Sequence, residues 1–223
     1  MTTRAFPKVP WSLRKPIKAN PRDHFSAEEL EKSKSYQRPL QYVGLAGSII
    51  STAVGLTLVG TKIFPTWAEK SSLGWPLQLV AVIAAIILVT QVISLPLGIW
   101  AEFGHERKWG FSTQTPGRYA GDQLKGLLLG VVLLSILFIP VWMLIRSTEL
   151  WWVFGGLIFM AFSVFVAFIL PVVIMPIFNK FTPLEDESLR TRLADLATKA
   201  GVSISDYQVM DASKRTRKDN AFF

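Results

Sequence analysis

The sequence contains no cysteine, only two histidines and few charged residues. Without cysteine the chain has no disulfide framework, no thiolate metal site and no point for palmitoylation. Charged residues make up 18% of the 223 residues, whereas half of the residues are apolar. An ordinary soluble domain has more charged residues than this, so the composition argues against that class. Residues 1–39 are polar and basic and lack a short apolar core, so no cleavable signal peptide is expected. The composition indicates a membrane protein.

Four apolar blocks carry this interpretation: 40–64, 75–100, 124–145 and 150–178. Each supplies the roughly 20 residues that a helix needs to cross about 30 Å of hydrocarbon. We therefore expect an all-α membrane protein with four transmembrane helices, followed at the C-terminus by a small and incomplete cytoplasmic α+β segment.

The distribution of lysine and arginine gives an orientation. When Lys125 is counted with the segment that it follows, the first, third and fifth polar segments hold nine, four and eight of these residues, whereas the second and fourth hold two and one. The positive-inside rule predicts a multi-pass protein with both termini in the cytoplasm, in a bacterial plasma membrane or the endoplasmic reticulum. The net charge of +8 follows from the same bias, so the expected partner is the lipid bilayer and not nucleic acid.

Ionisable residues are absent from the middle of all four blocks, although proton relays and ion pathways usually need them. This argues against a coupled transporter or channel.

Ser26 and Glu29 form a capping box, which predicts a helix that starts there and continues into the first block. Prolines inside the blocks, among them Pro96 and Pro171, are expected to kink or end helices.

The histidine spacing does not predict a zinc site. His105-Glu106 begins like an HExxH helix, in which the second histidine lies four residues on, one turn along the same face. Trp109 occupies that position, and the other histidine, His24, lies far away in the basic leader.

The segment after the fourth block resembles the start of a folded domain. Thr182, Pro183 and Glu185 together predict a capped helix that ends at Gly201. A strand is predicted over 207–211, followed by a basic turn over 213–219 and the first residues of a returning strand at 221–223. Because these 45 residues are too few for a stable core, we expect sequence after Phe223 to complete the domain.

Four polar motifs occur in order on the predicted cytoplasmic side. They are Phe25, Glu29, Ser33 and Ser35-Tyr36-Gln37; Glu106, Gly110-Phe111, Gln114-Thr115, Asp122 and Lys125; Pro176-Ile177-Phe178-Asn179-Lys180-Phe181-Thr182-Pro183-Leu184; and Asp211, Ser213-Lys214-Arg215 and Asn220-Ala221-Phe222. In this order, over residues 25–223, the chain resembles the type I CAAX prenyl proteases, integral-membrane zinc metalloendopeptidases of the HExxH class.

The resemblance implies a helical membrane chamber with a gluzincin-like catalytic domain. In such enzymes two histidines of HExxH and a distant glutamate hold zinc, and the motif glutamate activates the bound water. The resemblance also implies that Asn220, Ala221 and Phe222 lie on an edge strand beside the cleft, where an extended peptide can add its backbone as a further strand. Without the resemblance, these three residues would be interpreted as an ordinary buried strand.

The chain departs from the family pattern in two places. Residues 1–24 form a basic leader where eukaryotic-type members have a further span. The HExxH helix, the later glutamate and the closing spans would have to follow Phe223, so we expect no catalytic or metal-ligating residue in this chain and no zinc bound by it alone. The expected organisation is a leader over 1–25, a four-span membrane domain over 26–178 and a truncated start of a peptidase domain over 179–223.

Three functions are compatible with these features. The first is the amino-terminal membrane portion of a CAAX prenyl protease-like zinc metalloendopeptidase, inactive alone, whose substrates are membrane-associated or prenylated proteins. The second is a non-catalytic membrane scaffold or pseudoprotease that binds peptides or a partner subunit. The third, a small channel or transporter subunit, is disfavoured by the uncharged spans.

Overall fold

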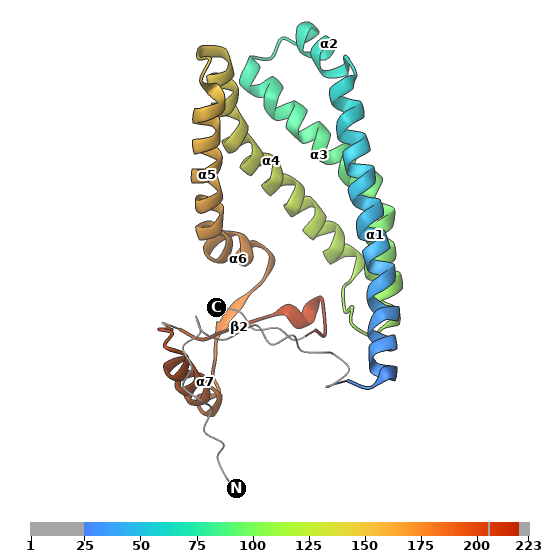
Figure 1. Ribbon diagram of the computed structural model, residues 1–223, viewed down its shortest axis with the longest axis vertical. Coiled ribbons are helices and arrows are strands. Elements are labelled where there is room, and N and C mark those ends of the chain that lie inside the picture. Colours follow the sequence, from blue (N-terminus) through green and yellow to red (C-terminus); the bar gives the residue numbers. More distant parts are fainter. Residues whose placement is uncertain (1–24, 205, 219–223) are drawn as a thin grey trace. The chain divides into compact units, whose positions relative to one another are not determined.

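The computed structural model describes residues 25–204 and 206–218 (Figure 1). It separates into two compact units, Met1–Gly44 and Leu45–Phe223, with the boundary inside the first helix.

The first helix, α1, covers Ala27–Gly60. It starts with a capping box, in which the backbone N–H of Ser26 donates to Glu29 Oε2 at 2.8 Å and the N–H of Glu29 donates to Ser26 Oγ at 3.2 Å. The predicted helix start, and its continuation into the first apolar block, are confirmed.

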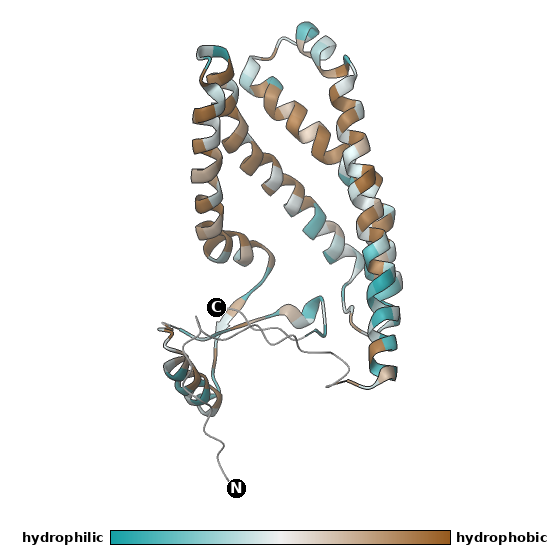
Figure 2. Cartoon of the chain, viewed as in Figure 1, coloured by the Kyte–Doolittle hydropathy of each residue, from teal (hydrophilic) through white to brown (hydrophobic). Residues whose placement is uncertain are grey.

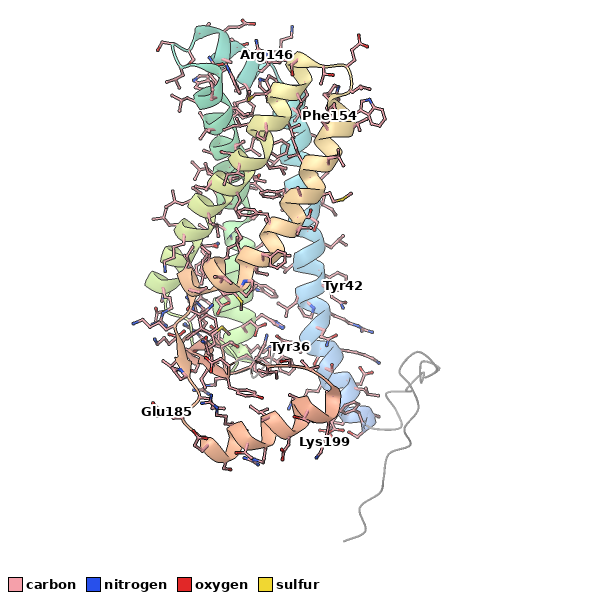
Figure 3. The ribbon with its side chains drawn as sticks, turned by 90° about the vertical axis from the view of Figure 1, so that its left-hand side faces the viewer. Tyr36, Tyr42, Arg146, Phe154, Glu185 and Lys199 are labelled. Carbon is pink, nitrogen blue, oxygen red and sulfur yellow. The ribbon has the colours of Figure 1, made fainter. Side chains whose placement is uncertain are left out.

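The second unit contains the other helices of the membrane part. In chain order they are α2 (Ile63–Lys70), α3 (Trp75–Ile99), the π-helix η3 (Trp100–Glu106), α4 (Pro116–Ser147), α5 (Trp151–Ile169), the π-helix η4 (Leu170–Ile174) and α6 (Met175–Phe178). Helix α4 packs against both α3 and α5 (Figure 1). Figure 3 shows Arg146 and Phe154 near the turn between α4 and α5, at the opposite end of these spans from Glu185 and Lys199.

Four helical segments of the described chain are long and apolar enough to cross a membrane: Ala27–Gly60, Trp75–Glu106, Pro116–Ser147 and Trp151–Phe178. Figure 2 shows apolar residues along most of their length, and large apolar side chains such as Leu128 and Phe168 are exposed, as lipid-facing residues are. The expectation of an all-α membrane protein with four spans and a small α+β segment is confirmed.

The first apolar block does not remain one helix to residue 64, as the hydropathy predicted. Helix α1 ends at Gly60, a bend follows at Thr61 and Lys62, and α2 begins at Ile63. Pro65 explains the break, because it has no N–H to donate to the carbonyl four residues earlier. It is tolerated in the first turn of a new helix, where that hydrogen bond is not needed.

Two prolines change the helical hydrogen-bonding pattern and do not end the helices. Pro96 lies inside α3, and the wider π pattern of η3 begins four residues later at Trp100. Pro171 lies within the π-helix η4. Proline removes one donor of the α-helical ladder, and π segments are a common form of helix distortion at such positions. The predicted interruption therefore takes the form of π segments.

The C-terminal segment pairs two short strands, β1 (Phe181–Pro183) and β2 (Gln208–Met210), in antiparallel register with Thr182 opposite Val209. Helix α7 (Glu187–Ala200) lies between them in sequence and ends at Gly201, whose φ of 70° is the left-handed conformation that glycine adopts readily. The short 3₁₀-helix η5 (Ala212–Lys214) follows β2. The predicted strand and the predicted helix stop are confirmed.

The predicted helix start at Thr182 is wrong. Thr182 lies in β1, and Glu185 precedes the helix instead of completing a capping box. The N-cap is Asp186, whose carboxylate accepts the backbone N–H of Leu189 at 2.9 Å. Because Thr182 is held extended by its pairing with β2, the next suitable side chain along the chain caps α7.

Candidate functional site

Motif residues from three distant parts of the chain meet around the guanidinium group of Arg215. Its Nε and Nη2 atoms donate to the two carboxylate oxygens of Asp122, at 2.8 and 3.1 Å. Its Nη1 donates to Asn179 Oδ1 at 2.8 Å, and its Nη2 also donates to the carbonyl oxygen of Phe178. One side chain therefore joins the start of α4, the end of α6 and the segment after η5. We call Arg215, Asp122, Asn179 and Gln114 the Arg215 cluster.

Local structure positions each partner of Arg215. Asp122 lies in the second turn of α4, whose N-cap Thr115 accepts the backbone N–H of Arg118 at 3.4 Å. Asn179 is the extended residue that ends α6, and its Nδ2 donates back to the carbonyl of Met175 at 3.3 Å. This bond leaves Asn179 Oδ1 free to accept from Arg215.

The cluster is shielded from solvent. The side chains of Arg215 and Asp122 are 24% and 19% exposed, and Gln114 is buried and donates to Asp122 Oδ2 at 3.3 Å. The hydrogen bonds to Asp122 raise the pKa of Arg215 above its ordinary value, so the guanidinium group is charged at every relevant pH. A bidentate arginine–carboxylate pair in such surroundings fixes both position and orientation.

Backbone hydrogen bonds attach the same segment to the loop between η3 and α4. The N–H of Thr113 donates to the carbonyl of Arg215 at 3.0 Å, and the N–H of Arg217 donates to the carbonyl of Phe111 at 2.8 Å. These bonds flank an antiparallel bridge between Ser112 and Thr216. Residues 215–217 are therefore held against residues 111–113 by one antiparallel bridge and its two flanking hydrogen bonds.

Two further ion pairs lie on either side of Arg215 in sequence. Lys218 Nζ lies 2.8 Å from Glu106 Oε2, at the end of η3. Asp211 accepts from the N–H of Lys180 at 2.8 Å and from Lys214 Nζ at 2.5 Å. The hydrogen bond from Lys214, followed by the one from Lys180, lowers the pKa of Asp211 below its ordinary value. Segment 211–218 is thus fastened along its length to the polar ends of the spans.

The three residues predicted to lie on the substrate side, Asn220, Ala221 and Phe222, are outside the described residues, so their role stays a prediction. The structure describes the chain up to Lys218, two residues before Asn220. Sequence reasoning did not predict the Arg215 cluster as a site. The resemblance did single out Asp122, Asn179 and Arg215 as motif residues, but not the contact between them.

The described residues do not fit a catalytic zinc site. His105 is buried beside two tryptophans of the same chain region. Its ring stacks on that of Trp100 with the centroids 5.4 Å apart, and the centroid of the Trp109 ring lies 6.1 Å from that of His105. Within residues 25–204 and 206–218, no three His, Cys, Asp or Glu side chains are grouped as metal ligands would be. We therefore assign no catalytic step to this part of the chain.

Residues 12–180 match the family model described as the CAAX prenyl protease N-terminal domain with five membrane helices. The described residues contain four candidate spans. The first part of the match, residues 12–24, lies outside the residues that the structure describes.

Eukaryotic and bacterial proteins are also similar to this chain in sequence. The chain is 30% identical to "Probable CAAX prenyl protease 1" of Schizosaccharomyces pombe, over 97% of this chain and 49% of the relative. It is 28% identical to "CAAX prenyl protease 1" of Saccharomyces cerevisiae (90% and 48%) and 25% identical to "Uncharacterized metalloprotease YhfN" of Bacillus subtilis (93% and 50%).

Its fold is similar to the crystal structure of Ste24p from S. mikatae, with a TM-score of 0.73 and 26% identity over 90% of this chain and 49% of that one. The chain spans about half the length of the relatives it matches.

Proposed function

The chain belongs to the CAAX prenyl protease family, and on this premise we propose that it forms the amino-terminal membrane portion of a zinc metalloendopeptidase that cleaves membrane-associated or prenylated proteins. The match to the family's N-terminal model and the names of the relatives support this proposal. The lysine and arginine bias supports a cytoplasmic position for both termini and for the Arg215 cluster.

The Arg215 cluster is the observation that carries the proposed role. It holds residues 215–217 against residues 111–113, a few residues before the predicted substrate-side residues Asn220, Ala221 and Phe222. An extended peptide that adds to a strand gains hydrogen bonds with a net value of only about 0.5–1.5 kcal/mol each. Because ordering the chain at the moment of binding would offset much of this gain, a segment that is attached to the membrane helices in advance favours binding.

The resemblance implies that catalysis uses the zinc ligands of an HExxH motif, which is not present in residues 1–223. The family's HExxH motif requires two histidines four residues apart, whereas this sequence has only His24 and His105. We propose that the chain alone neither binds catalytic zinc nor hydrolyses peptides, and that the zinc-binding part corresponds to the half of the relatives that this chain does not match.

Photo-crosslinking tests the substrate-side role without requiring catalysis. The chain carries p-benzoylphenylalanine at Phe222 in proteoliposomes and is irradiated with a farnesylated CAAX peptide. We expect a cross-link that is weakened by Arg215→Ala and retained in Arg217→Ala, a variant that removes the same charge two residues along. The control places the photoreactive residue at Phe154, at the other end of the spans (Figure 3). Equal cross-linking from both positions would contradict the proposal.

Peptide hydrolysis separates the protease from the non-catalytic scaffold. We expect that HExxH is encoded shortly after codon 223 in one of the three reading frames, and that a product joining both parts contains zinc and cleaves the prenylated peptide. A stable 223-residue product that binds peptides, with no such coding sequence downstream, would favour the scaffold.

A further inference from the structure

Helix α2 is a separate structural element between the first two spans. It covers Ile63–Lys70 and is joined to the end of α1 by two residues and to the start of α3 by four. The side chain of Gln78, in the first turn of α3, donates to the carbonyl of Ala68 at 2.9 Å and to that of Leu73 at 3.0 Å. This amide therefore fastens the last turn of α2 to the first turn of a candidate membrane span.

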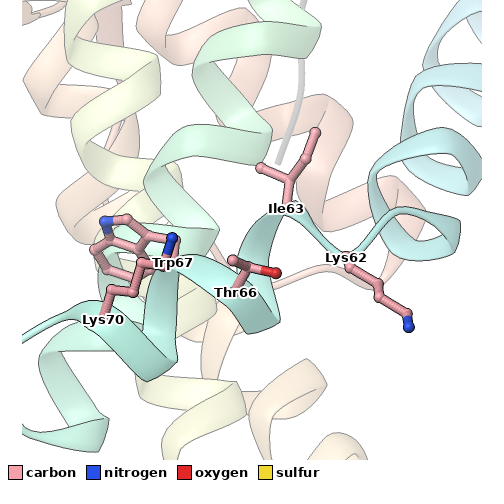
Figure 4. Close-up of a pocket in the computed structure, with 5 residues that line it drawn as sticks. All are labelled: Lys62, Ile63, Thr66, Trp67 and Lys70. Carbon is pink, nitrogen blue, oxygen red and sulfur yellow. The ribbon is translucent and has the colours of Figure 1, made fainter.

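The faces of α2 differ in character. Lys62, Thr66 and Lys70 recur every fourth residue along one stripe, and Ile63 and Trp67 form the neighbouring stripe. These five side chains line a shallow surface hollow, shown in Figure 4. Ile63 is 59% exposed and Trp67 is 38% exposed. A short helix with an apolar stripe beside a cationic one is typical of elements that lie in the membrane interface.

The two ammonium groups of this hollow have no protein partner in the part of the chain that the structure describes. Neither Lys62 nor Lys70 makes a salt bridge or a side-chain hydrogen bond with residues 25–204 or 206–218. Glu69, the acidic residue of α2, is not among the residues that line the hollow. Two of the three lysine and arginine residues in the second and fourth polar segments thus line the same hollow as Trp67.

We propose that this hollow, the α2 site, binds the phosphate of an anionic phospholipid headgroup in the leaflet at the α2 end of the spans. Lys62 and Lys70 supply the positive charge, and the Trp67 indole occupies the depth at which tryptophan is enriched in membrane proteins. The acyl chains continue along exposed apolar side chains of the adjoining spans, such as Val59 of α1 and Leu77 of α3. The site is independent of the proposed protease function, because α2 lies at the opposite end of α3 and α4 from β2, the strand that precedes η5 and Arg215 in the chain (Figure 1).

Quenching of Trp67 by brominated lipids tests the proposal. The full chain is reconstituted in phosphatidylcholine vesicles that contain either brominated phosphatidylglycerol or brominated phosphatidylcholine at equal mole fraction. The signal of Trp67 is the difference between the parent and Trp67→Phe, since the chain has eight tryptophans. We expect brominated phosphatidylglycerol to quench this signal with a relative association roughly 5- to 30-fold above that of the neutral lipid, from about 1 kcal/mol for each lysine near an anionic surface.

Charge variants identify the source of the preference. In Lys62→Gln/Lys70→Gln the preference for phosphatidylglycerol should fall to about one, whereas Lys108→Gln/Lys199→Gln, which removes two charges away from α2, should keep it. High salt should reduce it, because about 1 M salt shortens the Debye length to about 3 Å. Circular dichroism of each reconstituted variant verifies that its helix content is retained.

Several results would overturn the proposal. One is equal quenching by the two lipids, and another is a preference that survives Lys62→Gln/Lys70→Gln. Loss of the preference in millimolar inorganic phosphate would show that the α2 site takes a free anion instead of a lipid. Trp67 protected from both lipids, together with α2-to-α2 cross-links, would assign the hollow to a second copy of the chain.

Discussion

Replacement of Arg215 by alanine should release segment 211–218 from the membrane helices. The substitution removes four hydrogen bonds, two to Asp122 and one each to Asn179 and Phe178. Fully exposed ion pairs contribute about 0–1 kcal/mol, whereas removing one partner of a buried pair costs about 3–5 kcal/mol. Since the two charged side chains are 24% and 19% exposed, an intermediate cost of about 2–4 kcal/mol is expected.

Hydrogen exchange followed by mass spectrometry measures this release directly. The amides of Thr113 and Arg217 report on it, because both donate across the bridge between the loop and the segment. A cost of about 2–4 kcal/mol should accelerate their exchange roughly 30- to 1,000-fold. Arg217→Ala is the matched control, since that side chain is exposed and makes none of the side-chain hydrogen bonds or ion pairs found among the described residues.

A double-mutant cycle separates the ion pair from a general loss of structure. Asp122→Asn should also accelerate exchange, and the double variant Arg215→Ala/Asp122→Asn should cost clearly less than the sum of the two single changes. Arg215→Lys should be only a partial rescue, because an ammonium group cannot form the bidentate contact. Strict additivity, or equal exchange in Arg215→Ala and Arg217→Ala, would refute the assigned role of the cluster.

Three other perturbations have defined outcomes. Gly98→Ala would place a Cβ atom 2.4 Å from the Tyr119 hydroxyl, so it should destabilise the chain by about 1–3 kcal/mol in thermal unfolding in detergent, with substantial rescue by Tyr119→Phe. Asp186→Ala should cost α7 about 0.5–2 kcal/mol, measured by exchange of its first-turn amides, whereas Asp186→Asn should cost little because asparagine also caps helices. The hydrogen bond from Lys214 lowers the pKa of Asp211, so the stabilising contribution of this carboxylate is complete above the ordinary carboxyl pKa of 3.8 and is lost as the pH falls through the lower pKa of the folded state. Hydrogen exchange of the Lys180 amide, which donates to Asp211, should follow this pH profile. Asp211→Asn should abolish the pH dependence.

The membrane part was predictable because its signals are local or compositional. Apolar length predicted four spans, and the spacing of Ser26 and Glu29 predicted the start of α1. Each of these signals lies within one continuous stretch of chain. Hydropathy alone placed the end of the first span too far along, since it takes no account of the donor that Pro65 lacks.

The start of α7 and the Arg215 cluster were not predictable because both depend on pairing between distant segments. Thr182 satisfies the local rules for a helix cap, but its pairing with Val209 decides its conformation. Arg215 and Asp122 are 93 residues apart in sequence, and a single sequence contains no signal that they meet. The motif resemblance identified them as a set, and the structure adds that they contact one another.

The position of the Arg215 cluster explains why a charged contact is effective there. Within the hydrocarbon a charge is costly even when it is paired, and none of the four apolar blocks has an ionisable residue in its middle. In bulk water the same pair would contribute little, because solvent competes for both partners. The end of a span lies between these extremes: Asp122 is two turns into α4, and the surrounding helix ends reduce its exposure without removing it from water. A bidentate pair at this depth can fix segment 211–218 to the membrane helices while leaving the next residues of the chain available for a peptide, as the proposed function requires.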